Sequence, residues 1–157
     1  MSDAAWMKVA LEQAALALAE GNLPIGAAIV HEGSLVAVGR NGIESDSNDT
    51  RHAELVAIQA IPGFLFEHKR RCTIYTTLEP CMMCLGAIVN VGIVRVVFGA
   101  FDRLVGATGL LSHGDYYRRK GLELVAGVAA DESQALINEY VRRTGLRAHM
   151  STERSGT

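Results

Sequence analysis

The sequence predicts an α/β fold in which a sheet of about five strands carries helices on both faces. Two observations predict it. Strand-like segments rich in Val, Ile and Thr alternate with segments of helical character, in the order α-β-β-α-β-α-β-β-α. Two of the helical segments end at glycines, Gly21 and Gly92, and glycine is the residue most often found just past a helix C-terminus. The 157 residues are enough for one domain, spanning 1–157, with a core of its own.

The first element is a helix over residues 3–20, which contain no Gly or Pro and are apolar nearly all round, as in a helix covered on several sides. Residues 24–39 then predict two strands joined at a Glu32-Gly33 turn. In the later elements, β-branched residues mark strands, and Gly, Pro or polar clusters mark the boundaries. In chain order these are a polar loop over 40–50, a helix over 52–60 stopped by Pro62-Gly63, a strand over 72–78, a helix over 81–91, a strand over 94–100, an irregular segment over 101–119, a strand over 122–128 and a helix over 131–143.

Composition excludes several classes of protein. Hydrophobic residues make up 49% and charged residues 20%, an ordinary globular balance. No apolar run reaches the ~18 residues of a membrane span, and "MSDAAWMKVA" lacks the pattern of a signal peptide, so we expect a cytoplasmic protein with no membrane partner. The formal net charge of −2 argues against a chain that attracts nucleic acid as a whole. Residues from about 145 to 157 are expected to form a flexible tail.

Two short stretches combine side chains that bind metals. "HAELVAIQA" places His52 and Glu54 at the start of a predicted helix, and "LEPCMMC" places Cys81 and Cys84 at the start of another. With Cys72 the cysteines number three, and an odd count in a reducing compartment favours metal binding or catalysis over a disulfide framework. Pro80 suits a helix start, where a missing N–H costs little.

Helix geometry explains how the two stretches form one site. Cys81 and Cys84 are three residues apart and share a helix face, close to an N-terminus whose roughly +0.5 charge favours thiolates. If both helices point their N-termini at one centre, His52, Cys81 and Cys84 form a zinc set with the fourth position open to water, whose pKa zinc lowers from 15.7 to about 7. Glu54 then lies near the water without binding the metal and is positioned to move its proton.

Each part also has a structural interpretation. A His-x-Glu at a helix start is ordinarily a capping pair, and a Cys-x-x-Cys is also found as a redox pair. A closed structural zinc site needs a fourth ligand, for which Cys72 is the candidate, although its place at the start of an apolar strand favours core burial. The combination is more specific than its parts, because H-x-E followed by P-C-x-x-C is the signature of zinc deaminases that act on nucleobases.

The sequence resembles the cytidine deaminase-like superfamily, in the branch that holds tRNA adenosine deaminases, guanine deaminases and fungal-type cytosine deaminases. The resemblance runs from the first helix to about residue 143 and rests on "LPIGAAIV", "HAE" and "TLEPCMMCLGAI". It implies a three-layer α/β/α sandwich with a five-stranded mixed sheet, one zinc ion per chain and a homodimer. It also implies a hydrolytic deaminase in which zinc-activated water attacks the ring carbon that carries the amino group, with Glu54 as the proton shuttle.

The resemblance assigns three further residues to substrate binding. Asn41, eleven residues before His52, matches the base-contacting asparagine of the branch. Glu79, just before Pro80, matches a residue that meets the substrate or leaving group, although a helix-start carboxylate favoured by the dipole is an equal alternative. Ala53, between His52 and Glu54, is expected to contact the substrate with them.

The identity of the substrate stays divided at this point. "FGAFDRLVGATGLL" and Glu79 resemble the tRNA adenosine deaminases, but Gly42-Ile43, Arg51 and Leu104 depart from the pattern of that RNA-acting group. From residue 116 on, basic residues outnumber acidic ones by two, which indicates a solvated helix face rather than a phosphate-binding stripe. We therefore expect a free nucleobase or nucleoside as the substrate, with tRNA as the alternative and a non-catalytic zinc-binding scaffold as a minor third possibility.

Overall fold

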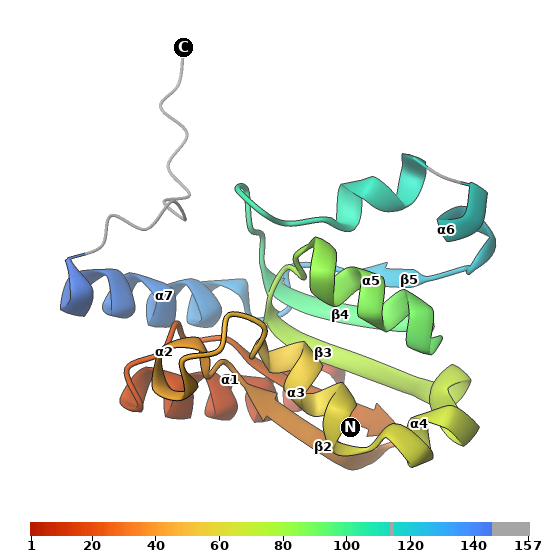
Figure 1. Ribbon diagram of the computed structural model, residues 1–157, viewed down its shortest axis with the longest axis horizontal. Coiled ribbons are helices and arrows are strands. Elements are labelled where there is room, and N and C mark those ends of the chain that lie inside the picture. Colours follow the sequence, from red (N-terminus) through yellow and green to blue (C-terminus); the bar gives the residue numbers. More distant parts are fainter. Residues whose placement is uncertain (114, 146–157) are drawn as a thin grey trace.

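The computed structural model describes residues 1–113 and 115–145, which form an α/β/α sandwich (Figure 1). Most of the expected tail lies outside the described residues. The strands are β1 (Gly26–His31), β2 (Ser34–Arg40), β3 (Cys72–Leu78), β4 (Arg95–Ala100) and β5 (Glu123–Val125). The α-helices are α1 (Asp3–Ala19), α2 (Ile43–Asp46), α3 (Ala53–Ala60), α4 (Pro62–His68), α5 (Met82–Val91), α6 (Asp115–Arg119) and α7 (Ala130–Thr144), with 3-10 turns η1 (Lys69–Arg71) and η2 (Thr108–His113).

Within the described ranges, five strands form one mixed sheet in the order β2-β1-β3-β4-β5. Strand β1 pairs antiparallel with both β2 and β3, whereas β3, β4 and β5 run parallel. Glu32 and Gly33 join β1 to β2 with positive φ angles of 48° and 78°, the conformation that a two-residue hairpin turn requires. The predicted hairpin, the mixed sheet and the three layers are confirmed.

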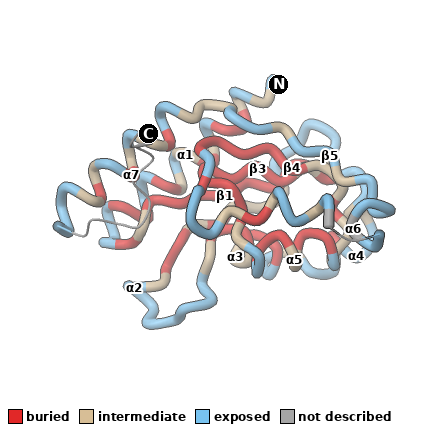
Figure 2. Tube along the Cα trace, turned by 90° about the horizontal axis from the view of Figure 1, so that it is seen from above, coloured by how far each residue is buried: buried red, intermediate tan, exposed pale blue. Residues whose placement is uncertain are grey.

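Each face of the sheet carries its own helices (Figure 2), with α1 and α7 on one side of the buried strands and α3 and α5 on the other. Trp6, Met7 and Ala10 of α1 pack against alternate residues of β1, β3 and β4. Ala53, Ala57 and Ile58 of α3 and Ile88 of α5 pack against the opposite face. Because side chains alternate across a strand, one run of apolar residues supplies both layers of the core.

The structure differs from the expectations in four places. Pro62 and Gly63 begin the short helix α4 instead of only ending the one before, because proline is accommodated in the first turn of a helix. Helix α2 lies inside the expected polar loop over 40–50, and η2 and α6 lie inside the expected irregular segment over 101–119. The last strand is three residues long, much shorter than 122–128. Among the described residues, no helix combines the length and apolar character needed to cross a membrane.

Candidate metal centre and active site

The two motif helices begin at one point in space. His52 is the N-cap residue of α3 and Cys81 is the N-cap residue of α5, and both have extended backbone angles. Cys84 lies one turn into α5 and is fully buried. Parallel β-α geometry explains the convergence, since β3 delivers the chain to the start of α5 beside the start of α3. The two positive helix ends therefore face a common centre.

Three side chains meet at that centre. The Nδ1 atom of His52 lies 3.7 Å from the Cys81 Sγ and 3.5 Å from the Cys84 Sγ. The potential ligand atoms of His52, Cys81 and Cys84 all lie within 4.8 Å of one another, and no further His, Cys, Asp or Glu joins this group in the part of the chain that the structure describes. An imidazole and two thiols suit zinc, and three protein ligands leave a fourth position open.

The third cysteine takes no part in this centre. Cys72 is buried at the first position of β3, and its Sγ donates to the backbone oxygen of His68 at 3.5 Å. Burial raises the pKa of the Cys72 thiol, so it remains a neutral group of the core. The expectation of core burial is confirmed, and the closed structural site that Cys72 was considered for does not form among the described residues.

The pKa values of the two metal-binding thiols are shifted in opposite directions. A hydrogen bond from the Cys84 thiol, and then one from His52, lowers the pKa of Cys81 to about 4. The same contact with Cys81, together with burial, raises the pKa of Cys84. The hydrogen bond with Cys81 also raises the pKa of His52. Two negative sulfurs this close repel each other, and a divalent cation between them offsets that repulsion, which matches a metal-binding site.

Glu54 lies beside the ligands and outside their set. It is the second residue of α3, it is 3% exposed, and it is absent from the group of atoms that can hold a metal. The hydroxyl of Thr76 on β3 lies 3.4 Å from Glu54 Oε1 and 3.2 Å from the backbone oxygen of Leu78, so the two acceptors share its one proton. Burial raises the pKa of the Glu54 carboxyl group above its ordinary value, so this carboxylate accepts a proton more readily than an exposed one would.

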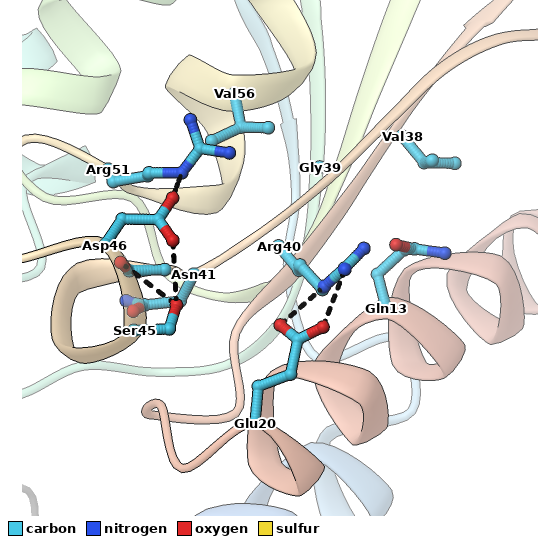
Figure 3. Close-up of a pocket in the computed structure, with 11 residues that line it drawn as sticks. Gln13, Glu20, Val38, Gly39, Arg40, Asn41, Ser45, Asp46, Arg51 and Val56 are labelled. Carbon is cyan, nitrogen blue, oxygen red and sulfur yellow. Dashed lines mark hydrogen bonds and ion pairs between the residues drawn. The ribbon is translucent and has the colours of Figure 1, made fainter.

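Asn41 directly follows β2 and is almost fully buried. Its backbone N–H donates to Ile25 and its Oδ1 accepts from the N–H of Ile43, so the side chain is fixed in orientation. Its Nδ2 donates to none of the described residues. Asn41 lines a polar pocket of about 380 Å³ (Figure 3), whose walls include the ion pairs of Arg51 with Asp46 and of Arg40 with Glu20. None of the three metal-binding residues lines this pocket.

Two residues that depart from the RNA-acting pattern touch each other. A Cβ on Gly42 would lie 3.1 Å from Nε of Arg51, so the glycine leaves room for the arginine side chain. Arg51 in turn pairs with Asp46 in α2. The two departures are therefore one local change, in which a salt bridge fixes the loop ahead of His52.

Glu79 has a structural role that its position in the sequence does not reveal. The side chain is buried, its Oε2 accepts from the N–H of Asp102 at 3.2 Å, and its Oε1 accepts from the N–H and hydroxyl of Thr108 at 3.1 and 2.5 Å. Cys81 forms a backbone bridge to Gly106. Glu79 therefore holds the loop over residues 101–108 against the start of α5. Its predicted contact with the substrate remains a prediction.

Two loop residues were missed by the sequence reasoning. Asp102 accepts through Oδ1 from the N–H groups of Leu104 and Val105, and Thr108 completes the contacts of Glu79. The signal that was available is "FDRLVG", an Asp followed by a Gly at turn spacing.

Ala53, the remaining predicted residue, is fully buried and packs its methyl group in the core under the site. Its substrate contact stays a prediction.

Comparison with known proteins places this geometry in a family. The family described as the cytidine and deoxycytidylate deaminase zinc-binding region matches residues 1–100. A tRNA-specific adenosine deaminase of Bacillus subtilis is 35% identical over 143 residues, which are 89% of each chain. A tRNA-specific adenosine deaminase of Haemophilus influenzae is 36% identical over 145 residues, covering 90% of this chain and 84% of its own.

Solved structures agree on the fold. A structure from work on A-to-I editing by tRNA:A34 deaminases at the wobble position of transfer RNA has a TM-score of 0.72 at 30% identity, and covers 84% of this chain and 98% of its own. A guanine deaminase from Nitrosomonas europaea also has a TM-score of 0.72, at 23% identity, and the match covers 88% of this chain and 84% of its own. At that identity the likeness supports the fold alone. The chain is therefore a zinc-dependent hydrolytic deaminase and belongs to the family of the cytidine and deoxycytidylate deaminase zinc-binding region.

Proposed function

We propose that the chain deaminates an adenosine in the anticodon loop of tRNA to inosine. This reverses the order given by the sequence, which favoured a free base. The observation that carries the proposal is the match to tRNA-specific adenosine deaminases at 35–36% identity over about nine-tenths of the chain. A guanine deaminase from Bacillus subtilis is 34% identical, but with a TM-score of 0.59 it covers only 64% of this chain and 66% of its own.

The chemistry follows from the residues at the two helix starts. His52, Cys81 and Cys84 would hold the zinc ion, which when bound supplies Lewis acidity that activates water. Glu54 takes one proton of that water on its carboxylate and delivers it to the ring nitrogen beside the attacked carbon. The proton left on the added oxygen then moves through the same carboxylate to the amino group, which leaves as ammonia while the ring keeps the oxygen. The Thr76 hydroxyl, which the Leu78 backbone oxygen shares, contacts the Glu54 carboxylate. The oxygen added to the ring and the ammonia released balance as hydrolysis.

The substrate side of the site involves Asn41 and the loop over 101–108. Asn41, with its Oδ1 fixed by Ile43, presents its Nδ2 for a hydrogen bond to an acceptor on the base or sugar. Glu79 holds the loop beside Cys81, where the base enters. Burial of Glu54 and Cys84 keeps bulk water away from the reacting atoms.

We also propose a homodimer. The α5 start and the neighbouring loop expose apolar side chains next to the metal ligands, and together they form a candidate subunit interface. Its members are Met82, Met83, Phe101, Leu104, Val105 and Leu110, with exposed fractions from 38% to 69%. Exposed apolar side chains gathered in this way typically mark an interaction surface.

A free nucleobase or nucleoside remains the second candidate. The observation that favours it is the Gly42 and Arg51 pair, which replaces residues expected in the RNA-acting group and fixes the loop ahead of His52. A scaffold that keeps zinc only for structure is disfavoured, because a structural site has no use for the buried Glu54 beside its ligands.

The deciding experiment uses purified, zinc-loaded protein. Total tRNA is incubated with the enzyme and digested, and its inosine is quantified by mass spectrometry, while a parallel panel of free bases and nucleosides is assayed for ammonia. Inosine in tRNA with an inert panel supports the proposal. Ammonia from guanine, cytosine or a nucleoside, with unchanged tRNA, supports the second candidate. Glu54→Gln controls for contaminating activity in both assays.

A further inference from the structure

Basic side chains from two segments some fifty residues apart meet at one end of the molecule. Turn η1 is the run Lys69–Arg71, and the end of α6 supplies Arg118 and Arg119, followed by Lys120. A depression of about 470 Å³ joins the two segments. It is lined by Arg70, Asp115, Tyr116, Arg119 and Lys120. We call the six cations of these two segments the basic surface.

Most of its charge is not neutralised. Arg71 pairs with Glu32, and Arg118 pairs with Asp115. Glu67 lies 3.8 Å from His68 and pairs with none of the six cations among the described residues. Among the described residues no carboxylate pairs with Arg70, Arg119 or Lys120, which are all exposed. Six cations against three carboxylates leave a clear local excess on a chain whose formal net charge is −2.

Aromatic rings hold the two lysines in place. The Lys120 Nζ lies 4.8 Å from the centre of the Tyr116 ring, and the Lys69 Nζ lies 5.0 Å from that of Phe66. Cation–π contact orders a lysine without cancelling its charge. The ammonium groups therefore remain available to an anion.

The basic surface has a fixed relation to the metal centre. The Lys69 side chain packs on Gly92, the C-cap of α5, where a Cβ would lie 3.3 Å from Lys69 Cδ. Cys81 is the N-cap of the same helix. Ten residues at a rise of about 1.5 Å each separate the two ends by about 15 Å. In Figure 1, α4 and α6 accordingly lie near the far end of α5.

We propose that the basic surface binds the phosphates of the RNA strand that carries the target base. The inference rests on the proposed function and names a contact surface for it. A nucleic-acid strand carries one phosphate per nucleotide, so a surface about one α5 length from Cys81 is within reach of the nucleotides that flank the base in the active site. A chain of net negative charge needs such a local excess to offset the cost of extruding a base from an RNA loop.

The expectation of a solvated helix face rested on a count of the charges from residue 116 onward alone. That count left out Lys69, Arg70 and Arg71, which precede β3 in the chain and lie close to α6 only in the folded protein. Of the seven basic residues it included, Arg147 and Arg154 lie outside the described residues. The proposal therefore departs from that expectation.

The test compares two double variants with the same change in charge. Arg70→Gln with Lys120→Gln removes two cations from the basic surface. Lys8→Gln with Arg142→Gln removes two exposed cations on α1 and α7 and serves as the control. Binding of a short RNA hairpin is measured from about 50 to 200 mM salt. The surface variant should bind about tenfold more weakly at low salt, and its slope of log affinity against log salt should be shallower by about 1.4, or about 0.7 per lost phosphate contact.

The outcomes separate this proposal from the proposed function. A surface variant that keeps the affinity and slope of the control, or a wild-type protein that binds no RNA, overturns the basic surface. If the wild type binds the hairpin through this surface but makes no inosine in tRNA, the surface stands and the proposed function fails. If the wild type makes inosine in tRNA but the surface variant keeps the salt slope of the control, the proposed function stands and the surface fails. Zinc content and unfolding midpoint are measured on both variants to show that they fold.

Discussion

The metal centre and the loop over residues 101–108 adjoin each other at Cys81, yet the chain builds them in different ways. The ligands come from two short motifs, and each is placed by the first turn of its own helix. The loop is placed by hydrogen bonds to Glu79 across more than twenty residues of sequence. Local geometry thus fixes where the metal binds, whereas long-range contacts fix the loop that lies beside it.

The difference has a consequence for mutation. Changes at the ligands should abolish zinc binding in an all-or-none manner, because three protein donors are the minimum for such a site. Changes at the loop should leave zinc in place and alter substrate handling by smaller factors. The following variants either sharpen this contrast or break it, in order of decreasing effect.

The largest effect is expected from Cys84→Ala. Removing one of three ligands should take the zinc content from about one per chain to nearly zero and reduce activity below detection. Cys72→Ala is the matched control, since its thiol is also buried but bonds to His68 instead of joining the centre. Metal analysis of both proteins decides the matter. Zinc retained by Cys84→Ala, or lost from Cys72→Ala, would mean that the ligand set is wrong.

Glu54→Gln should keep its zinc and lose at least ~100-fold in kcat, the low end of general acid–base catalysis. The amide has nearly the shape of the carboxyl group but cannot carry the proton. Thr76→Val, which removes the hydroxyl donor to Glu54, should lose much less activity. Single-turnover rates on zinc-loaded protein separate these cases. Near-normal turnover by Glu54→Gln would move the proton shuttle to another residue.

Glu79→Gln should leave zinc bound and loosen the loop. The two carboxylate oxygens of Glu79 accept hydrogen bonds from the backbone N–H groups of Asp102 and Thr108. In the variant, an amide NH2 group replaces one of these oxygens and cannot accept, so one backbone N–H loses its partner. An unsatisfied buried donor costs about 1–3 kcal/mol. Faster hydrogen exchange over 102–108 and a higher KM, with kcat less affected, are expected. If kcat collapses while exchange is unchanged, Glu79 acts on the substrate directly, as the resemblance implied.

The same contrast explains what the sequence could predict. His52, Glu54, Cys81 and Cys84 were assigned from two motifs because their relative positions depend only on helix starts, and the α/β order followed from local patterns. The contacts of Glu79 with Asp102 and Thr108, and the meeting of Lys69–Arg71 with α6, depend on tertiary packing. No local spacing encodes them. Pro62 was assigned to a helix end because a proline both stops one helix and suits the first turn of the next.

The homodimer is tested through the apolar side chains around the loop. Leu104 is 58% exposed and Val105 53% exposed, and covering them would remove apolar area from water. Sedimentation at micromolar concentration should show a dimer. Leu104→Gln should weaken association by about tenfold, about 1.4 kcal/mol, while zinc content stays the same. Arg103→Gln, a neighbouring polar change, is the control. A monomeric wild type would leave the exposed surface to another partner.

The smallest expected effect lies outside both regions, where Asp3 at the start of α1 binds Arg95 at the start of β4. The hydrogen bond from Arg95 lowers the pKa of Asp3 below its ordinary value of about 3.9. The contact therefore stabilises the fold above about pH 4 and is lost as pH falls through the lowered pKa of Asp3 in the folded protein. Because both side chains are partly exposed, the loss should be about 1 kcal/mol or less.

Urea unfolding of wild type and Asp3→Asn at pH 7 and pH 3 measures this contribution. The variant should be less stable at pH 7, and the gap should narrow at pH 3, because the Asp3 carboxyl group of the unfolded chain is then largely protonated. Glu12→Gln, on the exposed side of the same helix, should change stability little at either pH. Zinc content and kcat of Asp3→Asn at pH 7 should match the wild type, because Asp3 contacts neither the ligands nor the loop. A gap that widens at low pH would show that Asp3 is protonated more readily in the folded protein than in the unfolded chain, against the direction that Arg95 imposes.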